Sequence, residues 1–139
     1  MRNVKLWSAV LVLIAGSIFV VDSSLLAQRG GGNMPAGVQQ SKLPDGTMIL
    51  ADAKGMTLYT FAKDQPGVSN CNDNCAKNWP PLMAASDAKA DGAYSIIDRK
   101  DGTKQWAKDG MPLYYWVKDT KMGDITGDGV GGNWDLAKP

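Results

Sequence analysis

The two cysteines are the residues of this chain best suited to redox or metal chemistry. Cys71 and Cys75 lie in a polar stretch, and their spacing is one residue longer than Cys-x-x-Cys. The 139-residue chain holds two Cys and no His, so no further thiol or imidazole could complete a metal site. Because nearby thiols of exported proteins usually pair, we expect a structural disulfide worth about 2 kcal/mol. A redox-active or metal-binding pair is the alternative.

The glycine-rich segment 124–135 can be aligned with a calcium-binding loop, which makes Ca²⁺ the candidate cofactor. The oxygen ligands in that alignment would be Asp124, Thr126, Asp128 and Asp135. Gly129 would take the tight-turn position between them. A threonine at the third position and a short aspartate at the twelfth depart from the usual pattern. We therefore interpret the segment as a long turn whose glycines serve the backbone.

Aromatic and acidic side chains recur at matching positions and suggest two further sites. Trp79 and Trp134 are candidates for a platform on which a sugar or a planar ligand stacks. Duplicated aromatic residues more often form a shared core, which is the interpretation we prefer. Asp64 and Asp119 each follow a Lys and could form an acid–base pair. We expect instead that each carboxylate accepts backbone N–H groups in the turn after its strand.

Composition excludes several classes of function. Without His there is no Ser-His-Asp or Cys-His triad and no His-ligated zinc or haem. Fifteen basic against fourteen acidic residues give a net charge of +1, which does not favour nucleic acid as a partner. We therefore expect a protein that is not an enzyme.

The candidate aromatic, acidic and glycine-rich segments belong to an internal sequence duplication, which determines how they are placed in the fold. Residues 55–64 and 110–119 are identical at six of ten positions, with an offset of 55. The Asn-Trp pair at 78–79 returns at 133–134 with the same offset. Upstream, the Asp-Gly-Thr at 45–47 returns at 101–103 with an offset of 56. An ordered match of this kind indicates two copies of one structural unit.

Each copy has the pattern of antiparallel β-structure. Glycine turns separate short runs of β-branched, aromatic and Met residues, which lie at 47–51, 56–62, 94–97 and 111–117. Alternation puts Leu58 and Tyr59 on opposite faces of their strand, and both faces are largely apolar. Neither copy is large enough to form a core alone. We expect an all-β fold in which two pseudo-symmetric antiparallel β-meander repeats pack into one small sandwich or barrel.

The combined motifs resemble the bacterial secreted-repeat family, also described as predicted lipoproteins with a conserved Tyr-x-(Phe/Trp/Tyr)-x-x-Asp motif. The resemblance covers residues 45–137 and rests on Gly-x-x-Leu-Tyr-x-(Phe/Trp)-x-x-Asp, Cys-x-x-x-Cys-Ala-x-x-Trp-Pro-Pro-Leu and the glycine-rich end. The motif residues are Tyr59, Phe61, Asp64, Tyr114, Trp116 and Asp119. The resemblance implies an exported, often membrane-anchored protein of unknown molecular function and supplies no catalytic residues.

Residues 1–27 are typical of a secretory signal, with basic residues before the apolar run 6–21 and small residues after it. The run is shorter than the roughly 20 residues of a spanning helix, so we favour cleavage over an uncleaved anchor. No Cys near residue 27 could carry a lipid. Residues 28–37 are predicted to form a flexible spacer before the domain 38–139. The domain contains repeat one at about 38–82 and repeat two at about 93–137.

These observations predict an exported, non-enzymatic cell-envelope protein that is periplasmic or extracellular and acts as a binding or structural module. An envelope component or another exported protein would be its partner. The alternative is a periplasmic redox or metal-handling accessory that uses Cys71 and Cys75 or the 124–135 loop.

Overall fold

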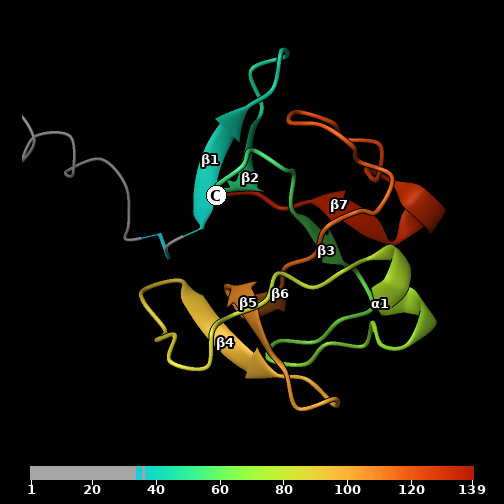
Figure 1. Ribbon diagram of the computed structural model, residues 1–139. Coiled ribbons are helices and arrows are strands. Elements are labelled where there is room, and N and C mark those ends of the chain that lie inside the picture. Colours follow the sequence, from blue (N-terminus) through green and yellow to red (C-terminus); the bar gives the residue numbers. More distant parts are fainter. Residues whose placement is uncertain (1–33, 36) are drawn as a thin grey trace, which may run out of the picture. The chain divides into compact units, whose positions relative to one another are not determined.

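Two hairpins of equal length open the two repeats. In the computed structural model, which describes residues 34–35 and 37–139, β1 (Val38–Lys42) pairs with β2 (Met48–Asp52). The second hairpin joins β4 (Tyr94–Asp98) to β5 (Lys104–Lys108). Both pairs are antiparallel, and an offset of 56 superimposes their bounds. Figure 1 shows the hairpins at opposite ends of the view.

Local chemistry explains why both hairpins turn at Asp-Gly-Thr. The Asp45 carboxylate accepts the Thr47 backbone N–H at 2.8 Å, and Asp101 accepts that of Thr103 at 3.0 Å. The glycine between them has a φ of 92° in the first turn and 85° in the second, a left-handed conformation that other residues rarely adopt. The repeated tripeptide is therefore a repeated turn.

The third strand of each repeat starts against its own hairpin and ends against the other repeat. In repeat two, β6 (Met111–Pro112) pairs with β5, and Tyr114 then bridges Pro81 of repeat one. In repeat one, β3 (Tyr59–Phe61) pairs antiparallel with β7 (Trp134–Leu136), the tail of repeat two. The segment that carries the repeated tyrosine, here called the aromatic strand, therefore pairs in each repeat with the tail of the other repeat.

Two short helical turns precede the tail segments at equivalent places. The helix α1 (Asn74–Asn78) lies before Trp79, and the 3-10 turn η1 (Val130–Gly132) lies before Trp134. The first turn ends one residue before Trp79 and the second ends two residues before Trp134, so they set where the two indoles enter the interior.

The all-β prediction is confirmed, whereas no closed barrel forms among the described residues. The strands make three small antiparallel sheets with the orders β1-β2, β3-β7 and β4-β5-β6. The strand predicted over 111–117 was too long, because the chain leaves β5 after Pro112 and continues towards the other repeat. The predicted runs also missed β1, β5 and β7, whose sequences mix polar with apolar residues.

The core consists of two clusters of buried side chains. The first core cluster consists of Leu43, Ile49, Tyr59, Phe61, Cys71, Trp79, Tyr114, Trp134 and Leu136. The second core cluster consists of Val38, Leu50, Leu58, Leu82, Tyr94, Trp106, Leu113 and Ala137. Neighbouring residues such as Leu58 and Tyr59 enter different clusters, as strand alternation predicts. Equivalent residues of both repeats therefore share each cluster.

The predicted signal segment and most of the predicted spacer, residues 1–33 and 36, lie outside the described residues. Within the described part, no helix has both the length and the apolar character needed to cross a bilayer.

Candidate functional site

The two motif tyrosines meet at the centre of the molecule. Tyr59 donates its backbone N–H to the Tyr114 carbonyl at 2.8 Å, and Tyr114 donates to the Tyr59 carbonyl at 2.9 Å. Both side chains are fully buried. This reciprocal pair relates the repeats by an approximate two-fold axis, and every other motif residue is arranged around it.

Each motif tyrosine binds the motif aspartate of the other repeat. The Tyr59 hydroxyl donates to Asp119 Oδ2 at 2.6 Å, and the Tyr114 hydroxyl donates to Asp64 Oδ2 at 2.7 Å. Both aspartates are 7% exposed. Hydrogen bonds to an ionised acceptor are short and strong, so these two bonds join the repeats firmly.

The other oxygen of each aspartate has the role predicted from the sequence. Asp64 Oδ1 accepts the backbone N–H of Asn70 at 2.6 Å. Asp119 Oδ1 accepts the backbone N–H of Thr126 at 3.0 Å. The turn contacts are therefore confirmed, whereas the sequence did not reveal the crossed bonds to the tyrosines.

Burial governs the titration of the two phenols and of the Asp64 carboxyl. It raises the pKa of the Tyr59 and Tyr114 hydroxyls, and the hydrogen bond to a carboxylate raises each further. Burial also raises the pKa of the Asp64 carboxyl, although the Asn70 N–H, the Tyr114 hydroxyl and the Arg99 charge oppose it. The phenols consequently stay protonated and act as hydrogen-bond donors.

Four aromatic rings form a continuous stack, here called the aromatic column, in the order Phe61, Trp134, Trp79, Trp116. Trp79 and Trp134 stack at 3.7 Å with 4° between their planes. Trp116 stacks on the outer face of Trp79 at 4.0 Å, and Phe61 on that of Trp134 at 4.4 Å. Tyr59 and Tyr114 touch the column edge-on, at 5.4 Å from Trp79 and 5.2 Å from Trp134 respectively.

The stacking shows whether Trp79 and Trp134 could form a platform for a ligand. Trp79 and Trp134 are each 5% exposed, and neighbouring rings cover both faces of each indole. Neither ring presents a free face to a sugar or a planar ligand. The structure places both in the shared core, which is the interpretation that the sequence favoured.

The glycine-rich segment closes over the column. A Cβ added to Gly127 would lie 2.9 Å from atoms of Trp116, Trp79 and Tyr59, and the Gly127 N–H donates to the Tyr59 hydroxyl at 3.2 Å. Real Cβ atoms do not approach ring atoms this closely, so only glycine fits at this position. Gly127 therefore has a packing role that the sequence pattern did not separate from turn geometry.

Two of the four residues aligned with a calcium loop, Asp124 and Thr126, make side-chain hydrogen bonds within the fold. Asp124 Oδ2 accepts the backbone N–H groups of Thr120 and Lys121, and these bonds lower the pKa of its carboxyl. Thr126 is bound to Asp119 through its hydroxyl at 2.6 Å. Asp135 lies in β7, opposite Thr60. Among the described residues, no three acidic, Cys or His side chains gather into a group that could hold a metal ion.

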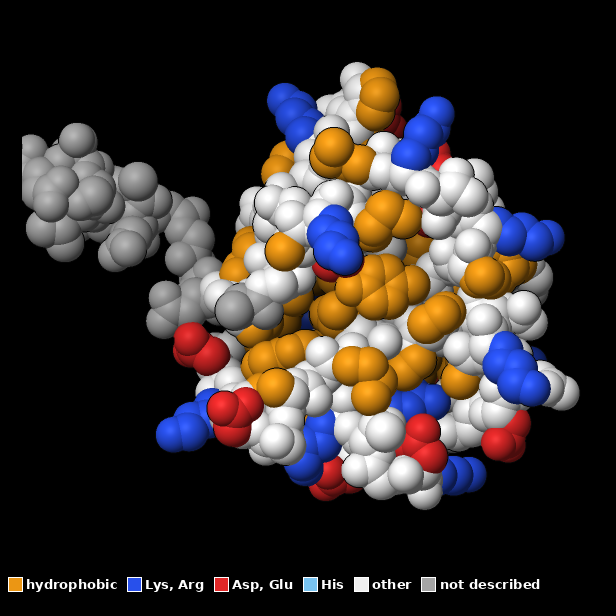
Figure 2. All heavy atoms as spheres, in the orientation of Figure 1, with side chains coloured by type: hydrophobic (Ala, Val, Ile, Leu, Met, Phe, Trp, Pro, Cys, Tyr) orange, Lys and Arg blue, Asp and Glu red, His pale blue; other side chains and the backbone are white. Residues whose placement is uncertain are grey.

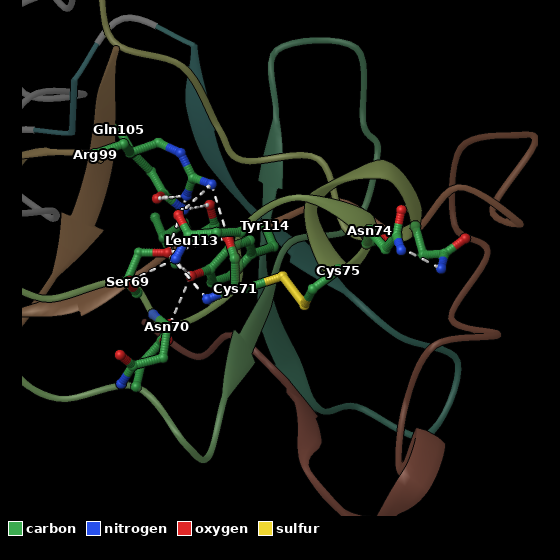
Figure 3. The surroundings of a disulfide bond; sticks show 12 residues. Ser69, Asn70, Cys71, Asn74, Cys75, Arg99, Gln105, Leu113 and Tyr114 are labelled. Atoms are coloured by element: carbon green, nitrogen blue, oxygen red, sulfur yellow. Dashed lines mark hydrogen bonds between the residues drawn. A yellow bond between two sulfur atoms is a disulfide. The ribbon is translucent and has the colours of Figure 1, made fainter. Parts of the chain in front are cut away.

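The predicted disulfide is present. Cys71 and Cys75 are joined, Cys71 is fully buried, and Cys75 lies in the first turn of α1. Asp73, the residue before α1, has a φ of 53°, which is unusual for an aspartate. Figure 3 shows the disulfide between α1 and a buried polar group that includes Tyr114.

Arg99 is the centre of that polar group and was missed by sequence reasoning. It is 6% exposed and donates to Ser69 Oγ at 2.9 Å, Gln105 Oε1 at 2.7 Å and the Cys71 carbonyl at 2.7 Å. Ser69 in turn shares a hydrogen bond with the Tyr114 hydroxyl. A charged residue in a strand–turn sequence normally predicts exposure. The signal that could have found it is the offset of 56, which aligns Arg99 with the buried Leu43.

A surface groove lies away from the motif residues. It consists of two adjoining hollows of about 190 and about 510 Å³ that share Met83 and Trp106. Tyr115 lines the first hollow, and its hydroxyl donates to Asp52 at 2.9 Å. The remaining lining residues are Met34, Pro35, Gly37, Val38, Ala53, Lys54, Leu82, Ala85, Ala88, Lys89 and Asp91. The groove thus combines aromatic and aliphatic walls with charged side chains.

Comparison with known proteins identifies the repeats. A family model described as a secreted repeat of unknown function matches residues 41–83 and again 95–138, which together make up more than half of the chain. No curated protein and no solved structure matches the chain. The two matched segments coincide with the two structural repeats.

Proposed function

Because the chain belongs to the family of secreted repeats of unknown function, we propose that this exported protein is a non-enzymatic module that binds a glycan of the cell envelope. The observation that carries the proposal is the groove around the exposed Met83 and the half-buried Tyr115, which combines apolar and aromatic surface with hydrogen-bonding groups. Sugars suit such a site because their C–H faces pack on aromatic rings while their hydroxyls bind polar side chains.

The arrangement of the motif residues supports a role in binding over one in catalysis. Asp64 and Asp119 each accept hydrogen bonds at both carboxylate oxygens. General acid–base chemistry needs a carboxyl group within reach of a substrate, and both groups are buried in the fold. The motif residues therefore join the two repeats, and the accessible groove binds the partner.

The surface around the groove is compatible with a carbohydrate. Figure 2 shows apolar side chains gathered across the middle of one face, with charged side chains mainly around its edge. Within the groove, Lys54 and Lys89 are balanced by Asp52 and Asp91. This balance suits a ligand with many hydroxyls better than one with a high net charge.

Titration with soluble peptidoglycan fragments and with a purified envelope polysaccharide tests the proposal, with tryptophan fluorescence as the signal. The variant Met83→Asp puts a charge on the groove wall, whereas Met122→Asp changes an exposed Met that lies outside the groove. We expect saturable binding by the wild type and by Met122→Asp, and binding about tenfold weaker or worse in Met83→Asp, since 1.4 kcal/mol corresponds to that factor. Unchanged spectra with both ligands, or equal affinities in both variants, would contradict the proposal.

A further inference from the structure

We propose that the aromatic column conducts one-electron oxidation inward, from Trp116 at the surface to the buried Tyr59–Asp119 pair. The proposal concerns a different part of the molecule from the groove and does not depend on glycan binding. Three observations support it: ring contact along the route, the placement of charges at its two ends, and a proton acceptor already bound to the terminal phenol.

The route consists of rings in contact. Trp116, which is only partly buried, stacks on Trp79 at 4.0 Å, and Trp79 meets the edge of Tyr59 at 5.4 Å. Indole and phenol are the side chains that most readily lose a single electron. Because π-systems in van der Waals contact overlap, an electron can pass between them without a mobile carrier.

Charges favour movement of the electron hole away from the surface. The Lys118 ammonium lies 5.7 Å from the centre of the Trp116 ring and opposes a positive charge on that ring. At the other end, the buried Asp119 carboxylate lies 2.6 Å from the Tyr59 hydroxyl and stabilises positive charge there. The energy of the hole therefore falls from Trp116 to Tyr59.

The pseudo-symmetric branch is less favourable because it contains a buried cation. Tyr114 touches Trp134 and binds Asp64, as Tyr59 touches Trp79 and binds Asp119. Arg99, however, donates to Ser69, whose hydroxyl is bound to Tyr114, and the Arg99 charge also acts on Asp64. Positive charge next to Tyr114 opposes oxidation at that ring, so Tyr59 is the end of the route.

The step balances in electrons and protons. An outer-sphere one-electron oxidant takes an electron from Trp116 and is reduced by one electron. Trp79 then donates an electron to the oxidised Trp116, and Tyr59 donates an electron to the oxidised Trp79. As Tyr59 loses its electron, its phenolic proton moves along the existing hydrogen bond to Asp119 Oδ2. The products are the reduced oxidant, a neutral tyrosyl radical and a neutral Asp119 carboxylic acid.

Pulse radiolysis with azide radicals tests the route, because this neutral oxidant attacks indoles. The full chain is used throughout, so Trp7 is present in every variant and cancels in the comparison. In the wild type we expect the indole-radical absorption to decay as the tyrosyl absorption grows, at a rate independent of protein concentration and slower in D₂O. Growth proportional to protein concentration would overturn the proposal, since the electron would then pass between molecules.

Matched variants locate the route. Tyr59→Phe should lose most of the tyrosyl signal, while its pseudo-symmetric counterpart Tyr114→Phe should keep it. Trp116→Phe should also lose the signal, whereas Trp106→Phe, in the second core cluster, should retain it. Equal signals in Tyr59→Phe and Tyr114→Phe would overturn the assignment to Tyr59. Should either tyrosine variant fail to fold, Trp116→Phe against Trp106→Phe decides, and equal signals there would likewise overturn the route.

Discussion

At the scale of single residues, the repeated motif is a pair of crossed hydrogen bonds. A tyrosine and an aspartate five residues apart do not bind each other, because the aspartate turns away from its own strand and meets the tyrosine of the other repeat. Both bonds are buried, so water cannot replace a lost partner. The motif therefore matters to the stability of the junction.

Removing one phenolic hydroxyl should destabilise the fold. Tyr59→Phe and Tyr114→Phe each leave a buried carboxylate oxygen without its donor, which should cost about 1–3 kcal/mol in the free energy of unfolding. Tyr115→Phe is the control, because its partner Asp52 is only partly buried and water can bind in place of the hydroxyl. Urea denaturation measures the differences. Equal losses of unfolding free energy in all three variants would show that the buried bonds between the repeats are no stronger than the partly exposed one.

Sequence alone could predict half of this arrangement. An aspartate after a strand predicts backbone N–H contacts in the next turn, and Asp64 and Asp119 make them. The tyrosine partner could not be predicted, because a local pattern carries no information about which distant segment lies beside a carboxylate. Arg99 was missed for the same reason, since its acceptors Ser69 and Cys71 are far away in sequence.

At the scale of elements, the two helical turns show how the repeats have diverged. In repeat one, the Cys71–Cys75 disulfide ties the first turn of α1 to the segment before it. At an offset of 55 the same positions in repeat two are Thr126 and Val130, and η1 forms there without a covalent bond. The disulfide therefore adds stability to a turn that the repeat can form without it.

Breaking the disulfide should weaken the fold without abolishing it. The closed loop is short, so the chain-entropy model predicts a loss of about 2 kcal/mol. Reduction of the wild type is the cleanest test, because both sulfur atoms stay in place, and the Cys71→Ala, Cys75→Ala double variant adds the cost of a cavity at the buried Cys71. Urea denaturation with and without a phosphine reductant measures the change. Complete unfolding on reduction would refute a merely supporting role.

At the scale of the whole molecule, neither repeat is a complete folding unit. The aromatic strand of each pairs with the tail of the other, and both core clusters contain residues from both halves. A single repeat would expose its half of each cluster and leave its motif aspartate without a phenol. The duplication is therefore an obligatory part of the fold.

Separate expression of the halves should show this dependence. Fragments cut in the exposed stretch near residue 90 should each lack a cooperative urea transition, while an equimolar mixture should regain one. Mixing should restore the cooperative transition because each half supplies the missing strand partner of the other. A cooperative transition in either fragment alone would contradict the interpretation.

The sequence predicted the overall fold because duplication and alternation are properties of the chain itself. An offset of 55 implies equivalent environments for Tyr59 and Tyr114, and both are buried in the first core cluster. The exchange of tails between repeats was not predictable, because a strand paired with its own tail would have the same alternation as one paired with its neighbour's.

The closest contact in the column joins one ring from each repeat, Trp79 and Trp134, held nearly parallel at 3.7 Å. Two indoles so placed share their electronic excitation, and their ultraviolet absorption differs from that of two separate chromophores. Since the coupling vanishes when the halves part, the protein carries a label-free optical reporter of its own assembly.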